Sequence, residues 1–428
     1  MSFLNYIIGL IAFIYAWKYA FSKKMVIENP WAKKVPYYCN QNLSFLLYCI
    51  LTAMLFIGPI SLVKYAVWIV IMLAMCGKAR FRKPWNAVIG AYTLFVLWNI
   101  YTISYSAYPS QGWMMVLKFS LPYLYFWLGY NAITCENDFY VFLKKTSWIC
   151  CIYALIIGGF SAKVLSPLYV FLNFTTGGLF ISYASLADFF AILICAPITM
   201  YLVTKDRKYL YMASWMLLST ILESVRTGLG ASVLAVSFFY MIVRKGKAVP
   251  YITLVLIAFV VSIFAIPPVR EKMFGEEVSN VSVGSASMDN VVMNGREYIW
   301  ESVMEQCYYG HELTGSGCGS ALGWRKQMFA EGNVLIHSDW VQMRCESGNF
   351  GMGLFIFFAI VMLFKVLTVT WIYKSSPTVT YAGAITVAAF AACFFAMGFD
   401  NVITYAQQGY VIPFVFLGIF YKSVDLRL

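Results

Sequence analysis

The residues best suited to chemistry lie in one polar stretch, residues 267–346, of an otherwise apolar chain. This stretch, called the polar island below, holds both histidines, His311 and His337, and 11 of the 19 acidic residues. A histidine suits proton transfer because its reference pKa of about 6.5 is close to neutral pH. No second histidine, cysteine or clustered carboxylate accompanies His337, so we predict no metal site there. His337 is a candidate for acid–base chemistry, with a structural role as the alternative, whereas His311 lies inside a glycine-rich turn and is a weaker candidate.

Two arginines add a possible anion site. Arg226 lies between two apolar segments, where an unpaired guanidinium near the bilayer costs at least about 2.5 kcal/mol. Either an anion site or an ion pair with Glu223, three residues earlier, would account for it. Arg296 falls in the first turn of an amphipathic helix that the apolar spacing predicts from about residue 296. A positive charge is unfavourable there, which indicates an anionic partner: a ligand, or a carboxylate such as Glu297 or Glu301.

Other features of the island have simpler interpretations. The glycine-rich run from residue 310 to 320 lacks the Gly-Lys-Ser/Thr ending of a phosphate-binding loop, so it is interpreted as a tight turn. Trp340 and Arg344 have helical spacing and predict an interfacial helix with an aromatic anchor. Of the 11 cysteines, three lie in the island, and an oxidising compartment would permit one disulfide, for example between Cys307 and Cys318.

The elements that must position these residues are membrane helices. Hydrophobic residues make up 61% of the chain and charged residues only 12%, which is typical of a polytopic membrane protein. We expect an all-α protein with about 12 to 14 transmembrane helices and one large extracytoplasmic loop that carries short helices. Residues 1–266 would hold about ten of the helices, residues 267–348 the loop and residues 349–428 about three more. The expected spans are 3–21, 43–63, 66–77, 85–105, 114–131, 146–160, 179–203, 210–224, 228–243, 249–266, 349–369, 379–397 and 409–420.

The charge distribution orients these helices. The net charge is +12, but the island carries 6 basic and 11 acidic residues, so the excess positive charge lies elsewhere, in short loops at every second connection. Basic loops tend to stay on the cytoplasmic side, which places the island outside. Membrane insertion and anionic lipid therefore explain the charge, and nucleic acid is not an expected partner. Lys118 and Asp188 also interrupt apolar runs and could line the same cavity as the arginines.

Taken in order, these motifs resemble the O-antigen ligase and polymerase superfamily of membrane glycosyltransferases. The resemblance covers roughly residues 217–354 and the number of helices. In place of the family's usual His-Asn pair, this chain has His337 followed by Ser338. The matching residues are Ser224, Arg226 and Thr227; Gly295, Arg296 and Trp300; Gly315, Gly317 and Gly319; and His337, Asp339, Gln342, Glu346 and Gly348.

The resemblance implies metal-independent glycosyl transfer at the outer face of the cytoplasmic membrane, with no cofactor. The donor would be an oligosaccharide on undecaprenyl diphosphate, and the acceptor another lipid-linked repeat unit. Arg226 and Arg296 would bind the diphosphate, and His337 would act as general base. Asp339 or Glu346 would orient the histidine. Arg344 and Arg325 are further candidates for anion contact, although solvated loop charges are the simpler interpretation.

Several functions remain open. We favour a repeat-unit polymerase, working with a chain-length regulator as a possible protein partner. The first alternative is an O-antigen ligase, which would transfer the glycan to lipid A-core. A different class is a flippase for the same lipid-linked oligosaccharide, or a solute transporter. The flippase predicts charges along a central channel and pseudo-symmetric halves, and the solute transporter would not need the large loop that carries His337.

Overall fold

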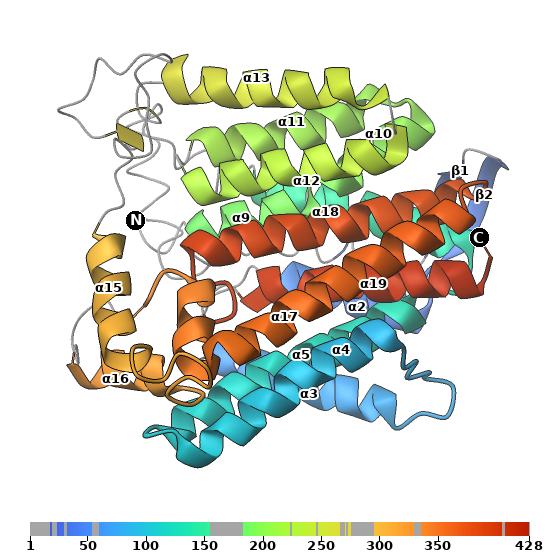
Figure 1. The fold of residues 1–428 in the computed structure, drawn as a ribbon. Coiled ribbons are helices and arrows are strands. Elements are labelled where there is room, and N and C mark those ends of the chain that lie inside the picture. The colour runs from blue at the N-terminus through green and yellow to red at the C-terminus, as the bar shows by residue number, and fades with distance from the viewer. Residues whose placement is uncertain are drawn as a thin grey trace, which may run out of the picture.

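The structure is a computed structural model, and it describes residues 24–29, 32–53, 60–154, 183–222, 225–244, 247–265, 295–328, 335–404 and 407–427, with a few isolated positions besides. Within these residues the chain is almost entirely helical, as Figure 1 shows. Five helical stretches are long and apolar enough to cross a membrane by length and composition: Ala87–Tyr105, Ala187–Thr204, Arg226–Arg244, Asp339–Ile372 and Pro377–Phe399. The expectation of an all-helical protein with several membrane-spanning helices is confirmed at this level.

Most expected spans correspond to a helix. The first expected span, 3–21, lies outside the described residues, as do Glu223 and Ser224. The helices before the island are α2 (Gln41–Ala53), α3 (Ile60–Cys76), α4 (Ala87–Thr102), α5 (Pro109–Ala132), α6 (Glu136–Tyr153), α9 (Tyr183–Leu193), α10 (Cys195–Thr204), α11 (Arg207–Leu222), α12 (Arg226–Arg244) and α13 (Val249–Ala265). After the island come α18 (Pro377–Phe399) and α19 (Gln407–Asp425).

The expected span 179–203 is described from Tyr183 onward. Helices α9 and α10 meet at Ile194, whose backbone stays in the α region, and residues 187–204 form one apolar stretch of membrane-spanning length. Pro197 explains the junction, because a proline has no N–H to donate to the carbonyl four residues earlier and its ring clashes with that carbonyl.

The basic stretch before α2 was expected to be a cytoplasmic loop, but it forms a hairpin. Strands β1 (Lys24–Asn29) and β2 (Ala32–Tyr38) pair antiparallel, with Lys24 opposite Tyr38. The Tyr37 hydroxyl donates a hydrogen bond to Asp138 of α6, which attaches the hairpin to the bundle.

The island contains three helical segments: α15 (Arg296–Cys307), α16 (Ser320–Met328) and the start of α17 (Asp339–Ile372). The expected amphipathic helix from residue 296 is confirmed by α15. The expected interfacial helix and the expected span 349–369 correspond to the two parts of α17, which are separated by a kink with non-helical backbone at Gly348. Trp340 is no interfacial anchor, because its Nε1 donates to the carbonyl of Phe394 in α18 at 2.9 Å and its ring packs on Phe355.

The glycine-rich turn supports this interruption. The amide of Ser316 donates to the carbonyl of Cys345 at 2.9 Å, and the amide of Gly317 donates to the carbonyl of Glu346 at 3.0 Å. These two carbonyls lie just before the break, where the helix cannot satisfy them itself. Gly348 has a φ of +68°, and a Cβ there would lie 2.3 Å from the carbonyl oxygen of Leu313. The turn is therefore a docking surface for α17, which the sequence interpretation did not foresee.

The helices lie side by side in the bundle, with α18 near its centre (Figure 1). Helix α18 packs on α12, α19, α17 and α9, while α5 packs on α19 and α4 packs on α17. A Cβ added at Gly418 of α19 would lie 2.1 Å from the Phe126 carbonyl oxygen, so glycine allows α5 and α19 to pack closely.

The two ends of the bundle differ. One end, called the loop end, carries α15 and α16; the opposite end carries the hairpin and the C-terminus (Figure 1). The connections from α3 to α4, from α10 to α11 and from α12 to α13 reach this opposite end, and they contain many of the basic residues. The arrangement agrees with the orientation inferred from the basic loops.

Candidate functional site

His337 lies at the loop end, just before α17, in a conformation uncommon for a side chain of its size. Its φ is +57°, in the left-handed region. Two contacts hold this backbone: the His337 amide donates to Oδ1 of Asn401 at 2.6 Å, and Ser338 caps α17 by accepting from the Val341 amide at 3.2 Å. Asparagine is an equally good cap. Ser338 therefore has a structural role as the N-cap of α17.

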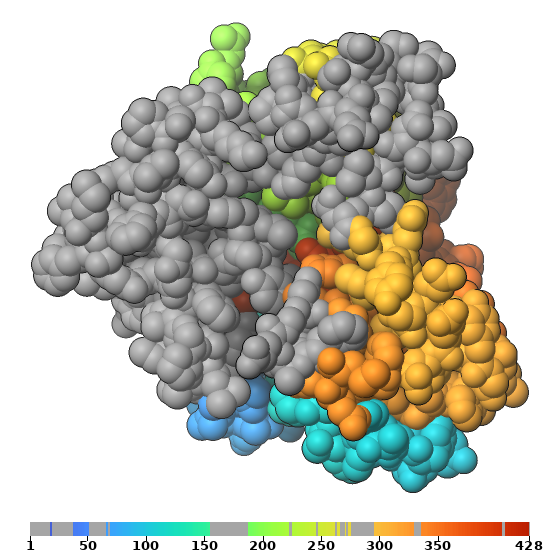
Figure 2. All heavy atoms as spheres, turned by 90° about the vertical axis from the view of Figure 1, so that its left-hand side faces the viewer, coloured from blue at the N-terminus to red at the C-terminus, as the bar shows by residue number. Residues whose placement is uncertain are grey.

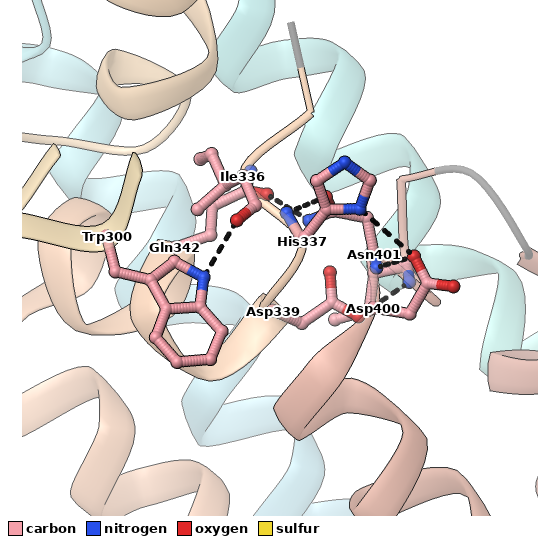
Figure 3. Close-up of polar contacts among 8 residues, drawn as sticks. Trp300, Ile336, His337, Asp339, Gln342, Asp400 and Asn401 are labelled. Atoms are coloured by element: carbon pink, nitrogen blue, oxygen red, sulfur yellow. Dashed lines mark hydrogen bonds and ion pairs between the residues drawn. The ribbon is translucent and has the colours of Figure 1, made fainter. Parts of the chain in front are cut away.

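The imidazole faces a carboxylate from α18's end. His337 Nδ1 lies 3.7 Å from Oδ1 of Asp400, and the other ring nitrogen points away from that carboxylate (Figure 3). Both side chains are largely buried, with exposures of 21% and 10%. A carboxylate at Nδ1 favours the tautomer whose other nitrogen accepts a proton. The separation exceeds a hydrogen bond, as is common before a substrate closes such a pair.

The two carboxylates expected to orient His337 have other contacts. Asp339 is buried, and its Oδ2 accepts from the amide of Ile403 at 2.9 Å. Glu346 is buried too, and its Oε1 accepts from Nε2 of Gln342 at 3.1 Å. Both residues are near the site and buttress it. The structure places Asp400, rather than either of them, against the ring of His337.

A polar network connects these groups beneath the loop end. The Gln342 Oε1 accepts from Thr404 Oγ1 at 3.4 Å and from Asn401 Nδ2 at 3.5 Å. Lys118 of α5 donates to the carbonyl of Thr404 at 3.0 Å, and its charge interacts with Asp339 and Glu346. Lys118 therefore belongs to this network, and its place in a cavity shared with the arginines stays a prediction.

Both arginines of the expected anion site reach this region. Helix α12 begins at Arg226 and α15 begins at Arg296, and the two guanidinium groups lie close enough to repel each other. Helix α15 is tied to the histidine segment, because Trp300 Nε1 donates to the carbonyl of Ile336 at 2.9 Å (Figure 3). Among the described residues, Arg296 interacts electrostatically with Asp188 of α9 rather than with Glu297 or Glu301.

Asp188 of α9 interacts electrostatically with both Arg296 and Asp400. Its side chain is 1% exposed, and neither carboxylate oxygen has a hydrogen-bond partner among the described residues. Arg296 attracts it, whereas the like charges of Asp400 and Asp339 repel it. Burying a carboxylate without hydrogen bonds is energetically costly, which makes Asp188 a candidate functional residue.

The second-tier arginines have structural surroundings. Arg344 donates to the Tyr308 hydroxyl at 2.8 Å and to Asn349 Oδ1 at 3.2 Å, and its guanidinium stacks on the Tyr308 ring. Arg325 is buried in α16, which packs on α5 and α17 rather than on α9 or α18. Neither arginine joins the cluster of His337, Asp400, Asp188, Arg226 and Arg296, called the cluster below.

The disulfide considered between Cys307 and Cys318 is absent, since all 11 cysteines are free thiols. The Cys318 Sγ faces the carbonyl of Gly112 at 3.7 Å, whereas Cys307 lies in a different small core with Cys345. Burial raises the pKa of the Cys307 thiol to about 11, so that it stays protonated at neutral pH.

Asp400 and Asn401 were missed by the sequence interpretation. They follow the apolar run of α18, and the chain turns back after them into α19. The signal was present: an acidic residue at the end of a membrane span is expensive and suggests a function. Their partner, His337, is far away in the sequence, and only the fold places it beside them.

Comparisons with protein-family models and with curated proteins find no match to this chain. Among the described residues, no three His, Cys, Asp or Glu side chains gather closely enough to hold a metal ion.

Proposed function

We propose that this chain is a polymerase of undecaprenyl-diphosphate-linked oligosaccharide repeat units, of the O-antigen or capsular type, acting at the outer face of the cytoplasmic membrane. The observation that carries the proposal is the pair of guanidinium groups, Arg226 and Arg296, that repel each other in the same region as the His337–Asp400 pair. The buried Asp188 interacts electrostatically with both Arg296 and Asp400. Two like charges in a half-buried place repel each other, and an anion bound between them would convert that repulsion into attraction.

A diphosphate has the chemistry to be that anion. In glycosyl transfer, the acceptor hydroxyl oxygen forms a bond to the anomeric carbon, and the bond from that carbon to the diphosphate oxygen breaks. The electron pair leaves with the diphosphate, and the two guanidinium groups stabilise its growing charge. No metal is required in this scheme, because the arginines supply the positive charge.

His337 supports the other half of the reaction. As the acceptor hydroxyl attacks, it loses a proton, and the ring nitrogen of His337 that points away from Asp400 takes it. Asp400 stabilises the resulting imidazolium, since it faces Nδ1. The substrate's glycan would occupy the loop end, and its prenyl tail the bilayer beside the helices.

The test uses source cells from which the gene for this chain is deleted, because they should accumulate its lipid-linked repeat unit. That lipid is supplied to purified wild-type protein, with and without a chelator, and the products are separated on a gel. We expect a ladder from the wild type in both conditions. His337→Ala and Arg296→Ala should reduce the rate of ladder formation by about 10²-fold or more. Arg80→Ala is the control and should keep the ladder, because Arg80 is exposed at the opposite end.

Two results would contradict the polymerase. Transfer of preformed polymer to lipid A-core, without any ladder, would identify a ligase that uses the same cluster. No transfer of either kind by folded protein would favour a transporter of the lipid-linked oligosaccharide.

A further inference from the structure

A second feature of the loop end is an open aromatic groove that the cluster does not use. The groove has a volume of about 590 Å³, within the usual range for ligand sites. Tyr101 and Tyr105 expose 60% and 42% of their surface there. Helix α4 ends beside it, and Figure 2 shows the cyan end of the α4 and α5 pair beneath the orange and yellow segments of the island. Its lining consists of Trp98, Tyr101, Tyr105, His311, Thr314 and Gly315.

The aromatic rings of this groove are fixed in place. The Trp98 Nε1 donates to the Ser347 carbonyl at 2.9 Å, and the Tyr105 hydroxyl donates to the Thr314 carbonyl at 2.8 Å. The ring centroids of Trp98 and Tyr101 are 5.4 Å apart, and those of Tyr101 and Tyr105 are 6.1 Å apart. Because these polar ring atoms are engaged by the protein, the ring faces of the groove are presented rigidly.

The lining favours a carbohydrate over a lipid headgroup. Among the described residues that line the groove, none is Lys, Arg, Asp or Glu, so an anionic headgroup would find no counter-charge. A sugar ring has an apolar C–H face that suits an aromatic face and hydroxyls that suit an imidazole and backbone groups. His311 and the turn around Thr314 supply the latter.

The wall of the groove is connected to the cluster by packing and by a chain of hydrogen bonds. A Cβ at Gly315, on the groove wall, would lie 2.6 Å from the Glu346 carbonyl oxygen, so the wall packs directly on α17. Glu346 is joined through Gln342 and Asn401 to the His337 amide. From Glu346 to Asp339, the helix rises only about 10 Å, a distance that a short glycan can span.

We propose that this groove binds the carbohydrate chain of the growing polymer and thereby controls product length. This proposal rests on the proposed function. A second point of attachment raises the effective concentration of the chain at the cluster, so that more units are added before it leaves. The groove does not take part in the reaction itself.

The experiment compares product length in the source organism, with its own copy deleted and variants supplied on a plasmid. Tyr101→Leu keeps an apolar surface and removes the aromatic face, whereas Tyr101→Phe keeps the face. We expect Tyr101→Leu to shorten the modal polymer by about twofold or more and Tyr101→Phe to leave it unchanged. Tyr211→Leu is the matched control, because Tyr211 is 65% exposed on α11, away from the groove.

The outcomes separate the groove from the proposed function. A ladder that is lost in His337→Ala but not shortened in Tyr101→Leu would overturn glycan binding in the groove and leave the proposed polymerase function intact. Equal shortening by Tyr101→Leu and Tyr211→Leu would also overturn it, since membrane anchoring by aromatics would then be the cause. Shortening by Tyr101→Leu alone, with membrane levels equal to wild type, supports glycan binding.

Discussion

The backbone conformation of His337 is energetically unfavourable, and the turn that holds it also places Asp400 beside the imidazole ring. A non-glycine residue with a φ of +57° is uncommon, and strained residues of this kind persist where the surroundings hold them firmly. Asn401 holds the backbone while its neighbour Asp400 faces the ring. One turn after α18 thus holds the backbone of the histidine and places a carboxylate near its Nδ1.

We expect Asp400→Asn to lower kcat by about 10²-fold or more, with little change in KM, because an amide cannot stabilise the imidazolium as a carboxylate does. The measurement is the rate of polymer formation at several concentrations of lipid-linked repeat unit. Asp206→Asn, at the exposed connection between α10 and α11, serves as the control and should be silent. An unchanged kcat in Asp400→Asn would remove Asp400 from the reaction.

Asp188 should show opposite effects on stability and activity. Neither oxygen of its buried carboxylate has a hydrogen-bond partner among the described residues. Because a neutral amide costs less to bury than a carboxylate, Asp188→Asn should raise the free energy of unfolding by about 1–3 kcal/mol. The same change replaces the carboxyl group that interacts with Arg296, so the KM for the lipid-linked donor should rise. Both are measured on purified protein, by unfolding in mixed micelles and by polymer formation.

Asp138 is the matched control for this prediction. It is equally buried, but its carboxylate accepts from the Thr134 amide at 2.7 Å and from the Thr134 hydroxyl at 2.6 Å. Asp138→Asn should therefore destabilise the protein. A loss of stability in Asp188→Asn as well would contradict the prediction, because it would show that the Asp188 carboxylate is stabilised in the folded protein.

At the scale of elements, the break in α17 decides how the island meets the bundle. We expect Gly348→Ala to destabilise the protein by at least about 2 kcal/mol, because alanine is strained at positive φ and its Cβ would clash with Leu313. Thermal unfolding in detergent is the measurement. Gly353→Ala, in the same helix with open space around it, should be neutral or stabilising. Equal effects of the two substitutions would show that the break is dispensable.

The elements also show what the sequence could and could not predict. Long apolar runs predicted α4, α5, α12 and α18 because membrane helices satisfy their own backbone groups locally. The hairpin before α2 was missed, since short strands carry weak signals within a basic stretch. The junction between α9 and α10 could have been inferred from Pro197 alone.

The site was predicted only in part, for a physical reason. His337, Arg226 and Arg296 stand out because polar residues are rare in such a chain, and all three lie in one region of the fold. Asp400 was missed, and Asp188 was noticed without a position. Contacts between residues far apart in sequence depend on how helices pack, and a single sequence contains no direct record of that.

At the scale of the whole molecule, the two ends of the bundle have different chemistry. The cluster and the groove share the loop end with the acidic island, and many basic connections lie at the opposite end. A substrate with a membrane tail and an outer glycan could therefore meet both sites from one side of the bilayer. This arrangement requires the loop end to face outward.

The cysteines provide a test of that orientation. Cys135 is the one exposed cysteine and precedes α6 at the opposite end, whereas Cys307 and Cys318 are buried at the loop end. We expect a membrane-impermeant maleimide to label Cys135 only after intact cells are permeabilised. Cys307 should resist labelling even then, because burial raises the pKa of its thiol to about 11 and excludes the reagent. A Cys135→Ser variant should lose this labelling, which assigns the maleimide signal to Cys135. Labelling of Cys135 in intact cells would place the opposite end outside and the cluster on the cytoplasmic side. That result would contradict polymerisation at the outer face of the membrane.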